Sequence, residues 1–197
     1  MKIELLLLAA GQSKRFSGIK QLADIYGHAM VCHSLLSYQQ QGQWLDGIDN
    51  TVVVLGANAH AIKKTLADKV TTHIVKSWAQ GMGSSLSESM EVLSPETTHL
   101  MVGLADQVAI KPESIKAFVA QSFQYPHKII AAQYQGKVGA PAIFPKSYFP
   151  LLRQLQGDRG AKSILLNNLE QIIKVAMPSA SIDIDTQADL LEFLGKQ

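Results

Sequence analysis

The sequence predicts an α/β fold with a mostly parallel sheet, and three observations support this prediction. Short apolar runs alternate with longer amphipathic stretches along the whole chain, which is typical of repeated strand–helix–strand units. The first run, residues 3–8, is aliphatic and too short to span a bilayer, as expected of a strand that is buried on both faces. No repeat, low-complexity tract or long linker divides the chain, so we expect a single domain over residues 1–197.

The alternation assigns each expected element in order. Strands are expected near residues 3–9, 51–56, 72–76, 99–104, 128–134 and 172–176. Helices are expected near residues 29–42, 59–68, 84–93, 112–122, 146–155 and 160–169. Pro112 suits the first position of its helix, because the N–H that proline lacks would have no partner there. Thr186 suits the N-cap of a terminal helix that runs through Leu194.

Composition and charge narrow the classes of protein. The formal charge of +2 is mild and no basic stripe is present, so we expect no nucleic-acid partner. Cys32 is the only cysteine, which excludes an internal disulfide and a cysteine metal site. Residues 11–15 interrupt the first apolar run, so neither a signal peptide nor a membrane span is expected. We therefore expect a cytoplasmic protein with no membrane partner.

The end of the first expected strand has the composition of a polyphosphate pocket. Small residues are followed by hydrogen-bond donors and three cations: Ala9, Ala10, Gly11, Gln12, Ser13, Lys14, Arg15 and Lys20. Small residues let a ligand approach the backbone, and ligands bind at the carboxyl ends of parallel strands. The spacing excludes both the P-loop and the dinucleotide fingerprint. The alternative is a surface turn with solvated lysines.

Acidic residues are expected at the same edge of the sheet. Ala105 and Asp106 follow the expected strand at residues 99–104 directly, and Asp185 offers a second carboxylate. Mg²⁺ prefers oxygen ligands and is commonly held by one or two carboxylates together with substrate phosphates. Asp183 and Asp185 alternate with apolar residues, so both would face the same side of an extended segment. The alternative is that each acid is a turn or cap residue.

The sequence allows two interpretations for each of two glycine-containing loops. Residues 77–86 lead into a helix, whose first N–H groups could meet a base, a ribose or a phosphate. The alternative is an ordinary capped helix with Trp78 packed over the loop. Residues 157–160 are either a helix-initiating turn or a binding loop. The histidines lack zinc-like spacing and no G-x-S-x-G elbow is present, which disfavours zinc and serine hydrolases.

Residues 8–20 resemble the pattern L-A-A-G-x-S-x-R-[MF]-G-x-x-K, which opens the nucleotidyltransferases related to molybdenum cofactor cytidylyltransferase and guanylyltransferase. Further matches lie at residues 78–86, 104–107, 139–144, 157–161 and 183–190, so the resemblance covers nearly the whole chain. It implies a Rossmann-like, three-layer α/β/α nucleotidyltransferase fold. The match is closest to the cytidylyltransferase branch.

The resemblance also implies roles for individual residues. Arg15, Lys20 and Asp106 would be catalytic, and Asp106 with Asp185 would hold Mg²⁺. The residues implied to bind the nucleotide are Leu8, Ala9, Ala10, Gly11, Gln12, Ser13, Arg15, Lys20, Gly81, Ser84 and Ser85.

The activity that the resemblance implies is a CMP transfer. CMP from CTP would pass to the phosphate of molybdopterin cofactor with release of pyrophosphate, and a molybdoenzyme would receive the product. One alternative is a nucleotidyltransferase that acts on a sugar phosphate or another small phosphate. Another is a non-catalytic accessory protein that binds a nucleotide or cofactor.

Overall fold

A seven-stranded sheet forms the centre of the protein in a computed structural model that describes residues 1–67 and 70–195. The strands are β1 (Ile3–Ala9), β6 (Asn50–Leu55), β7 (Thr71–Ile74), β8 (His99–Leu104), β9 (Ile129–Tyr134), β10 (Lys137–Pro145) and β11 (Ile172–Ala176). Their order is β11-β9-β10-β8-β1-β6-β7. Only β10 runs antiparallel to its neighbours in this sheet, and the other pairs are parallel. The predicted mostly parallel sheet is therefore confirmed.

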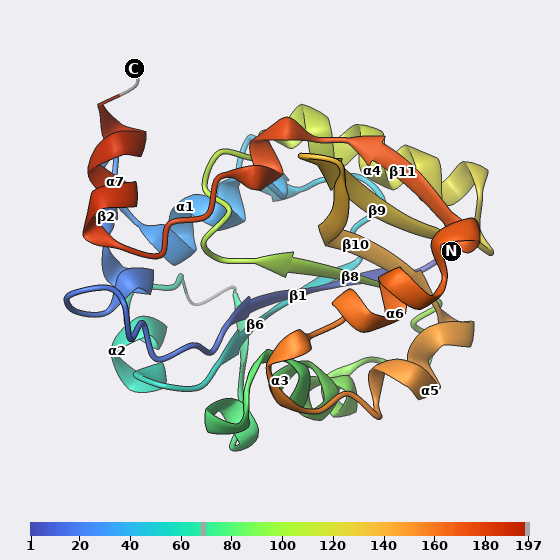
Figure 1. Cartoon of the computed structure of the whole chain (residues 1–197), viewed down its shortest axis with the longest axis horizontal. Helices are drawn as coiled ribbons and strands as arrows, with labels where there is room; N and C mark the ends of the chain where they lie inside the picture. The colour runs from blue at the N-terminus through green and yellow to red at the C-terminus, as the bar shows by residue number, and fades with distance from the viewer. Residues whose placement is uncertain (68–69, 196–197) are drawn as a thin grey trace.

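Helices cover both faces of the sheet and complete three layers (Figure 1). They are α1 (Met30–Leu36), α2 (Ala59–Lys63), α3 (Met82–Ser89), α4 (Pro112–Gln124), α5 (Phe149–Leu152), α6 (Lys162–Asn167) and α7 (Gln187–Leu194). Residues of α1, α2 and α4 share one hydrophobic cluster with the sheet, while residues of α3, α5 and α6 share the cluster on its other face. The expected Rossmann-like, three-layer α/β/α arrangement is present.

The central strand β1 shows why its residues form a strand that is buried on both faces. Leu5 and Leu7 belong to the cluster of α1, α2 and α4, while Leu6 and Leu8 belong to the cluster of α3, α5 and α6. Successive side chains of a strand point to opposite faces, so an unbroken aliphatic run fills both clusters. β6 and β8 flank β1 in parallel, and the ends of all three strands meet at one edge of the sheet.

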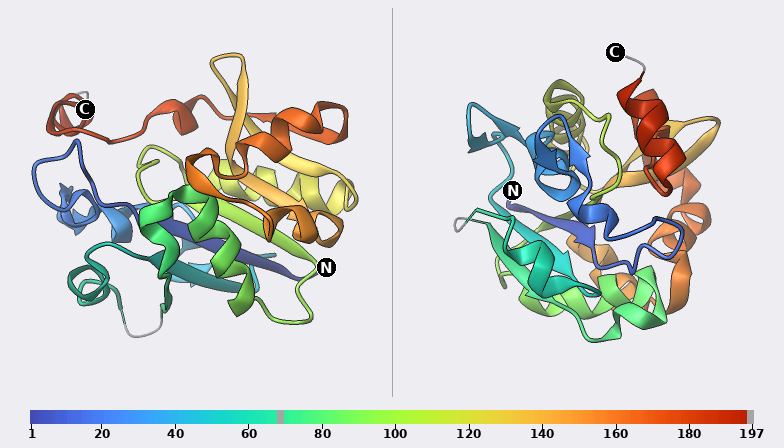
Figure 2. Two further views of the ribbon diagram at one scale, coloured as in Figure 1. Left: turned by 60° about the horizontal axis from the view of Figure 1, so that its bottom comes forward. Right: turned by 90° about the vertical axis from the view of Figure 1, so that its left-hand side faces the viewer.

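The last helix brings the C-terminal segment to that same edge. Thr186 caps α7 as predicted, because its side chain accepts the N–H of Asp189 and the Asp189 carboxylate accepts the N–H of Thr186. Leu190 of α7 and Ile184 before it pack in a third hydrophobic cluster with Phe16 of the loop after β1. Figure 2 shows α7 beside that loop in both views. The acids at 183 and 185 are therefore carried to the β1 loop.

The expected strands agree with the structure to within about two residues, but several other elements differ. The strand β10 was not expected. The helix expected at 29–42 ends at Leu36 and is followed by a short hairpin of β4 (Gln39–Gln40) and β5 (Gln43–Trp44). The helix expected at 59–68 ends at Lys63, and residue 68 lies outside the described residues. The helices expected at 84–93, 146–155 and 160–169 are shorter, and each has a neighbouring 3₁₀ turn.

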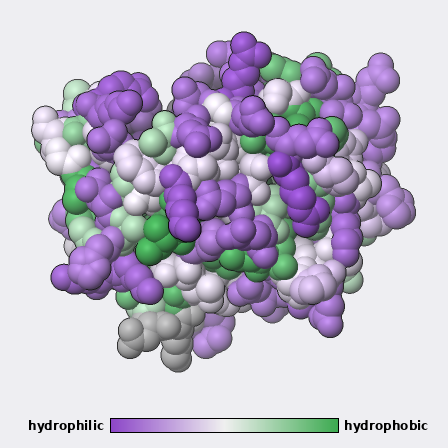
Figure 3. Space-filling view, turned by 90° about the horizontal axis from the view of Figure 1, so that it is seen from below, coloured by the Kyte–Doolittle hydropathy of each residue, from purple (hydrophilic) through white to green (hydrophobic). Residues whose placement is uncertain are grey.

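The surface is mixed in character. The face seen in Figure 3 is mainly hydrophilic, and its apolar side chains lie in scattered patches. Within residues 1–67 and 70–195, no helix has both the length and the apolar character that crossing a membrane requires.

Candidate active site

A cavity of about 630 Å³ opens at the edge of the sheet where β1 and β8 end. Its walls come from the loop after β1, the start of α3, the loop after β8, the turn at Asp158 and the segment before α7. The catalytic and metal-binding residues expected from the sequence, Arg15, Lys20, Asp106 and Asp185, all line it. Every expected nucleotide-binding residue except Ser84 also lines it, namely Leu8, Ala9, Ala10, Gly11, Gln12, Ser13, Arg15, Lys20, Gly81 and Ser85.

One buried side chain, that of Gln21, holds the loop after β1 in its conformation. Gln21 is only 2% exposed and donates from Nε2 to the carbonyl oxygens of Ala9 and Gly11, at 3.1 and 2.9 Å. Its Oε1 accepts the hydroxyl of Ser13 at 3.0 Å. The Ser13 oxygen in turn accepts the N–H of Lys20 at 3.2 Å. These bonds hold the small residues of the loop in position against the cavity.

Two cations and two carboxylates form a network in the cavity. The Lys20 ammonium lies 2.7 Å from Oδ2 of Asp106 and 2.9 Å from Oδ1 of Asp185. Arg15 pairs with the other oxygen of Asp185 at 2.8 Å. Burial acts to lower the pKa of Lys20, but the two carboxylates outweigh it and raise that pKa above its usual value. Burial acts to raise the pKa of Asp185, but Lys20 and Arg15 outweigh it and lower that pKa.

The carboxylates of this network fit a divalent cation. Oδ1 of Asp106 is buried and has no hydrogen-bond partner among the described residues, so it is available as a ligand. Asp183 lines the cavity together with Asp185, as their alternation with apolar residues predicted. Burial, followed by the charges of Asp106 and Asp185, raises the pKa of Asp183 to about 6. A concentration of oxygen ligands and negative charge suits a hard cation such as Mg²⁺ or Mn²⁺.

The glycine at the start of α3 is required by a close approach of two loops. Gly81 has a φ of +115°, and a Cβ on it would collide with Asp158 and would lie 2.6 Å from the carbonyl oxygen of Gly157. A Cβ on Gly83 would lie 2.9 Å from the carbonyl oxygen of Gln156. Both contacts are closer than real side chains make, so residues 81–84 and 156–158 pack backbone against backbone.

Ser84 takes part in this packing instead of lining the cavity. Its hydroxyl oxygen accepts the N–H of Gly157 at 3.1 Å, and Ser84 lies on a separate, shallower depression. The expectation that Ser84 binds the nucleotide is therefore not supported by its position, because the hydroxyl is turned to the neighbouring loop. Ser85 lines the cavity, with its hydroxyl donating to the carbonyl of Gly81 at 3.0 Å.

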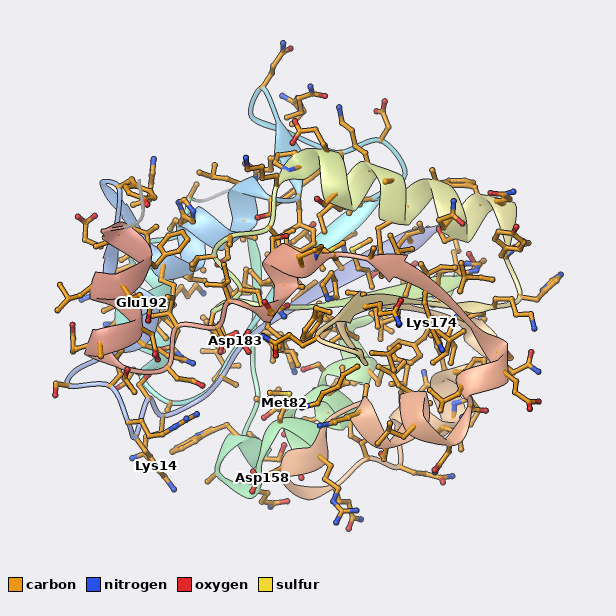
Figure 4. The ribbon with its side chains drawn as sticks, turned by 45° about the horizontal axis from the view of Figure 1, so that its top comes forward. Lys14, Met82, Asp158, Lys174, Asp183 and Glu192 are labelled. Atoms are coloured by element: carbon orange, nitrogen blue, oxygen red, sulfur yellow. The ribbon has the colours of Figure 1, made fainter. Side chains whose placement is uncertain are left out.

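Some cavity residues were not expected as site residues. Asp158 belongs to the turn at residues 157–160, which the sequence left open between a helix start and a binding loop. The structure shows both features, because Gly157–Arg159 is a 3₁₀ turn ahead of α6 and Asp158 lines the cavity. Trp78 and Met82 also line it. Figure 4 shows Met82 and Asp158 near the start of α3, while Asp183 extends from the segment before α7.

A second group of titratable side chains lies behind the loop at residues 77–86. The Glu88 carboxylate accepts the N–H groups of Lys76 and Ser77, each at 2.8 Å. Burial acts to raise the pKa of Glu88, but hydrogen bonds from Ser77 and Lys76 outweigh it and lower that pKa. His73 and Glu91 lie near the same carboxylate. One ring nitrogen of His73 and one carboxylate oxygen each of Glu88 and Glu91 lie within 4.8 Å of one another. Because both oxygens of Glu88 are held by main-chain amides, the evident role of Glu88 is to fix the start of the loop.

The loop of small residues after β1 lies beside cations and carboxylates at the carboxyl edge of a parallel sheet, which is the arrangement of a nucleotide-binding α/β protein. Residues 5–172 match the model of the MobA-like NTP transferase domain, and the chain belongs to this family of nucleotidyltransferases.

The chain is also similar to curated relatives. The chain is 25% identical to the purine catabolism protein PucB of Bacillus subtilis strain 168, over 80% of this chain and 78% of PucB. It is 26% identical to the bifunctional protein GlmU of Clostridioides difficile strain 630 over 80% of this chain, but it spans only about a third (32%) of GlmU.

Among solved structures, Rv0371c of Mycobacterium tuberculosis H37Rv shares the fold with a TM-score of 0.84, 24% identity and complete coverage of both chains. Its structure in complex with manganese gives a TM-score of 0.79 with the same identity and coverage. The CMP:2-keto-3-deoxy-manno-octonic acid synthetase complexed with CTP gives 0.77 at 14% identity, over 99% of this chain and 98% of that one. These solved structures therefore share the fold of this chain over nearly its whole length.

Proposed function

We propose that this protein transfers CMP from CTP to the phosphate of molybdopterin cofactor, with release of pyrophosphate. The observation that carries the proposal is the position of Lys20 between Asp106 and Asp185, inside the cavity that the loop after β1 borders. The family supports nucleotidyl transfer, and the CTP complex of a synthetase with the same fold supports a cytidine nucleotide. We further propose one domain over residues 1–197, acting in the cytoplasm, with a molybdoenzyme as recipient.

The charge of each site residue sets its role in the proposed reaction. Arg15 would bind the β and γ phosphates, which leave as pyrophosphate, and the N–H groups of the loop at Gly11 would hold them in place. Lys20 would neutralise the charge that builds on the reacting phosphate. Asp106 and Asp185 would hold a divalent cation, which when bound would supply positive charge to the triphosphate. The manganese complex of Rv0371c supports a divalent cation here, either Mg²⁺ or Mn²⁺.

The acceptor itself is the nucleophile in this scheme. An oxygen of its phosphate attacks the α-phosphorus of CTP, the new P–O bond forms, and the bond to the leaving pyrophosphate breaks in line. The protein therefore needs no nucleophile of its own, and positioning with charge neutralisation supplies the catalysis. Lys20 is suited to this task because its ammonium already lies beside two carboxylates and would exchange one of these contacts for the substrate phosphate.

The test is pyrophosphate release with Mg²⁺ or Mn²⁺, molybdopterin as acceptor, and CTP, GTP, ATP or UTP in turn. Release with CTP that depends on the acceptor is the expected result. Release with a different nucleotide would keep the reaction class and contradict the choice of CTP. Release only with a sugar phosphate as acceptor would favour the alternative of a nucleotidyltransferase that acts on sugar phosphates. Nucleotide binding without pyrophosphate release, with molybdopterin and with a sugar phosphate as acceptor, would favour a non-catalytic accessory protein.

A further inference from the structure

One carboxylate in the cavity stands apart from the network of charges. Asp158 lines the cavity and is exposed to it, yet its side chain makes no hydrogen bond or ion pair with any residue in the described ranges. The acids of the network, by contrast, have a lysine or a second carboxylate beside them. Asp158 therefore has a free acceptor group facing the space where a ligand would lie.

The position of Asp158 is fixed by the backbone around it. Gly157 donates its N–H to Ser84, and the missing side chain of Gly81 leaves the room that Asp158 occupies. On the other side of the turn, Gly160 has a φ of +53° and packs on Met82, whose sulfur would lie 3.0 Å from a Cβ at position 160. A carboxylate on a turn that is held at three points is preorganised to make a directional hydrogen bond.

The negative charge of Asp158 determines which part of a nucleotide would contact this side of the cavity. The phosphates are anionic and suit the cations of the β1 loop, while an unpaired carboxylate repels them. Asp158 lies beside the start of α3 and lines the cavity together with the apolar side chains of Trp78 and Met82. Asp183 lines the same cavity, and Figure 4 shows it on a different segment from Asp158. Apolar surface with one hydrogen-bond acceptor suits the ring and the edge of a base.

We propose that Asp158 selects the base of the nucleotide by accepting a hydrogen bond from the 4-amino group of cytosine. A carboxylate is an acceptor only, and cytosine offers an N–H₂ donor where uracil has a carbonyl oxygen. With UTP, two acceptors would face each other and the carboxylate would lose its partner. This inference rests on the proposed function, and it assigns the base preference of that site to one residue.

The experiment is titration calorimetry of CTP and UTP in the presence of Mg²⁺ and without acceptor, so binding is measured apart from turnover. The wild-type protein is expected to bind CTP at least about tenfold more tightly than UTP. Asp158→Asn is expected to lower or reverse this ratio, because an amide can turn to donate to the uracil oxygen. Asp158→Ala is expected to bring the ratio close to one. Asp46→Asn, an exposed change outside the cavity, is the matched control and should keep the wild-type ratio.

Each other outcome identifies which statement fails. Equal binding of CTP and UTP by the wild type would overturn the inference and leave nucleotide binding intact. The inference is likewise overturned if both Asp158 variants keep the wild-type ratio of CTP to UTP affinity. No binding of any nucleotide by folded wild-type protein would overturn the proposed function, and the inference with it. Circular dichroism melts of each variant establish that it is folded.

Discussion

Replacing Gln21 with leucine tests whether the loop after β1 has its conformation before a ligand binds. The Gln21 side chain makes three hydrogen bonds, to the carbonyls of Ala9 and Gly11 and with the hydroxyl of Ser13, and it is 2% exposed. A net contribution of about 0.5–1.5 kcal/mol each gives a loss of about 1.5–4.5 kcal/mol in the free energy of unfolding. For a chain of this size, we expect the Tm to fall by about 5–15 °C.

Thermal melts and CTP titration measure the two consequences. The Tm should fall as stated, and the affinity for CTP should fall by about tenfold, because binding must then order the loop. Gln124→Leu, at the exposed end of α4, is the matched control and should change the Tm by less than about 2 °C. If Gln21→Leu melts and binds CTP like the wild type, the loop does not depend on this side chain and the reasoning is refuted.

Four further changes test the site. Asp106→Ala should lower pyrophosphate release by at least about a hundredfold with the Tm nearly unchanged, because it removes an oxygen ligand from a loop without removing core volume. Lys20→Ala should lower release at least about tenfold more than Lys14→Ala, since Lys20 contacts two site carboxylates whereas Lys14 contacts no described residue through a hydrogen bond or ion pair. Gly81→Ala should lower the free energy of unfolding by about 1–3 kcal/mol in melts, because of its positive φ and its contact with Gly157. Glu88→Gln should lower the Tm at pH 7 by about 1–4 °C. Since the folded-state pKa of Glu88 is lowered, its stabilisation is present above the ordinary pKa of 4.5, and the difference between the two proteins should shrink as the pH falls below it.

These four expectations can each fail separately. Activity in a folded Asp106→Ala protein would remove Asp106 from the reaction. Equal effects at Lys14 and Lys20 would indicate a diffuse electrostatic pocket. A Gly81→Ala protein with unchanged Tm would show that the loop at 156–158 can move aside. A Tm difference for Glu88→Gln that grows toward low pH would contradict the sign of its pKa shift.

The parallel strands could be predicted because burial on both faces leaves a plain signal. The run at residues 3–8 is aliphatic at every position except Glu4, and β1 is accordingly buried along its whole length. β10 carries no such signal, since Gly139, Pro141 and Pro145 interrupt its apolar residues and its pairing with β9 shifts register between Gly139 and Ala142. Proline and glycine argue against a strand unless the pairing itself is known.

The helix expected at residues 29–42 shows a second limit. Its apolar residues continue past Leu36 to Tyr38, which is fully buried, so the pattern gives no sign that the helix has ended. The chain then turns back through Gln41 and Gly42, both with positive φ, and forms the hairpin of β4 and β5. Glutamine is not one of the residues that ordinarily mark such a turn, so Gly42 alone carries the usual turn signal here.

Site residues that lie just after a strand could be placed from the sequence. Gly11 follows β1 and Asp106 follows β8, and the parallel pairing of these strands puts both residues at one edge of the sheet. Ser84 and Ser85 differ, because their orientation depends on the rotation of α3, which begins at Met82. Neighbouring residues of a helix point in directions about 100° apart, so only one of the two serines faces the cavity.

The residues that would decide the base lie in segments far apart in the sequence, and this explains why the base could not be derived from a motif. The loop at residues 77–86 shapes one wall of the cavity, but Asp158 reaches that wall only because Gly81 and Gly83 allow the two backbones to meet. A side chain at either glycine would displace the turn that carries the carboxylate. If Asp158 selects the base as proposed, base selection depends on both loops, and we expect that transferring the loop at residues 77–86 alone to a relative would not transfer a preference for CTP.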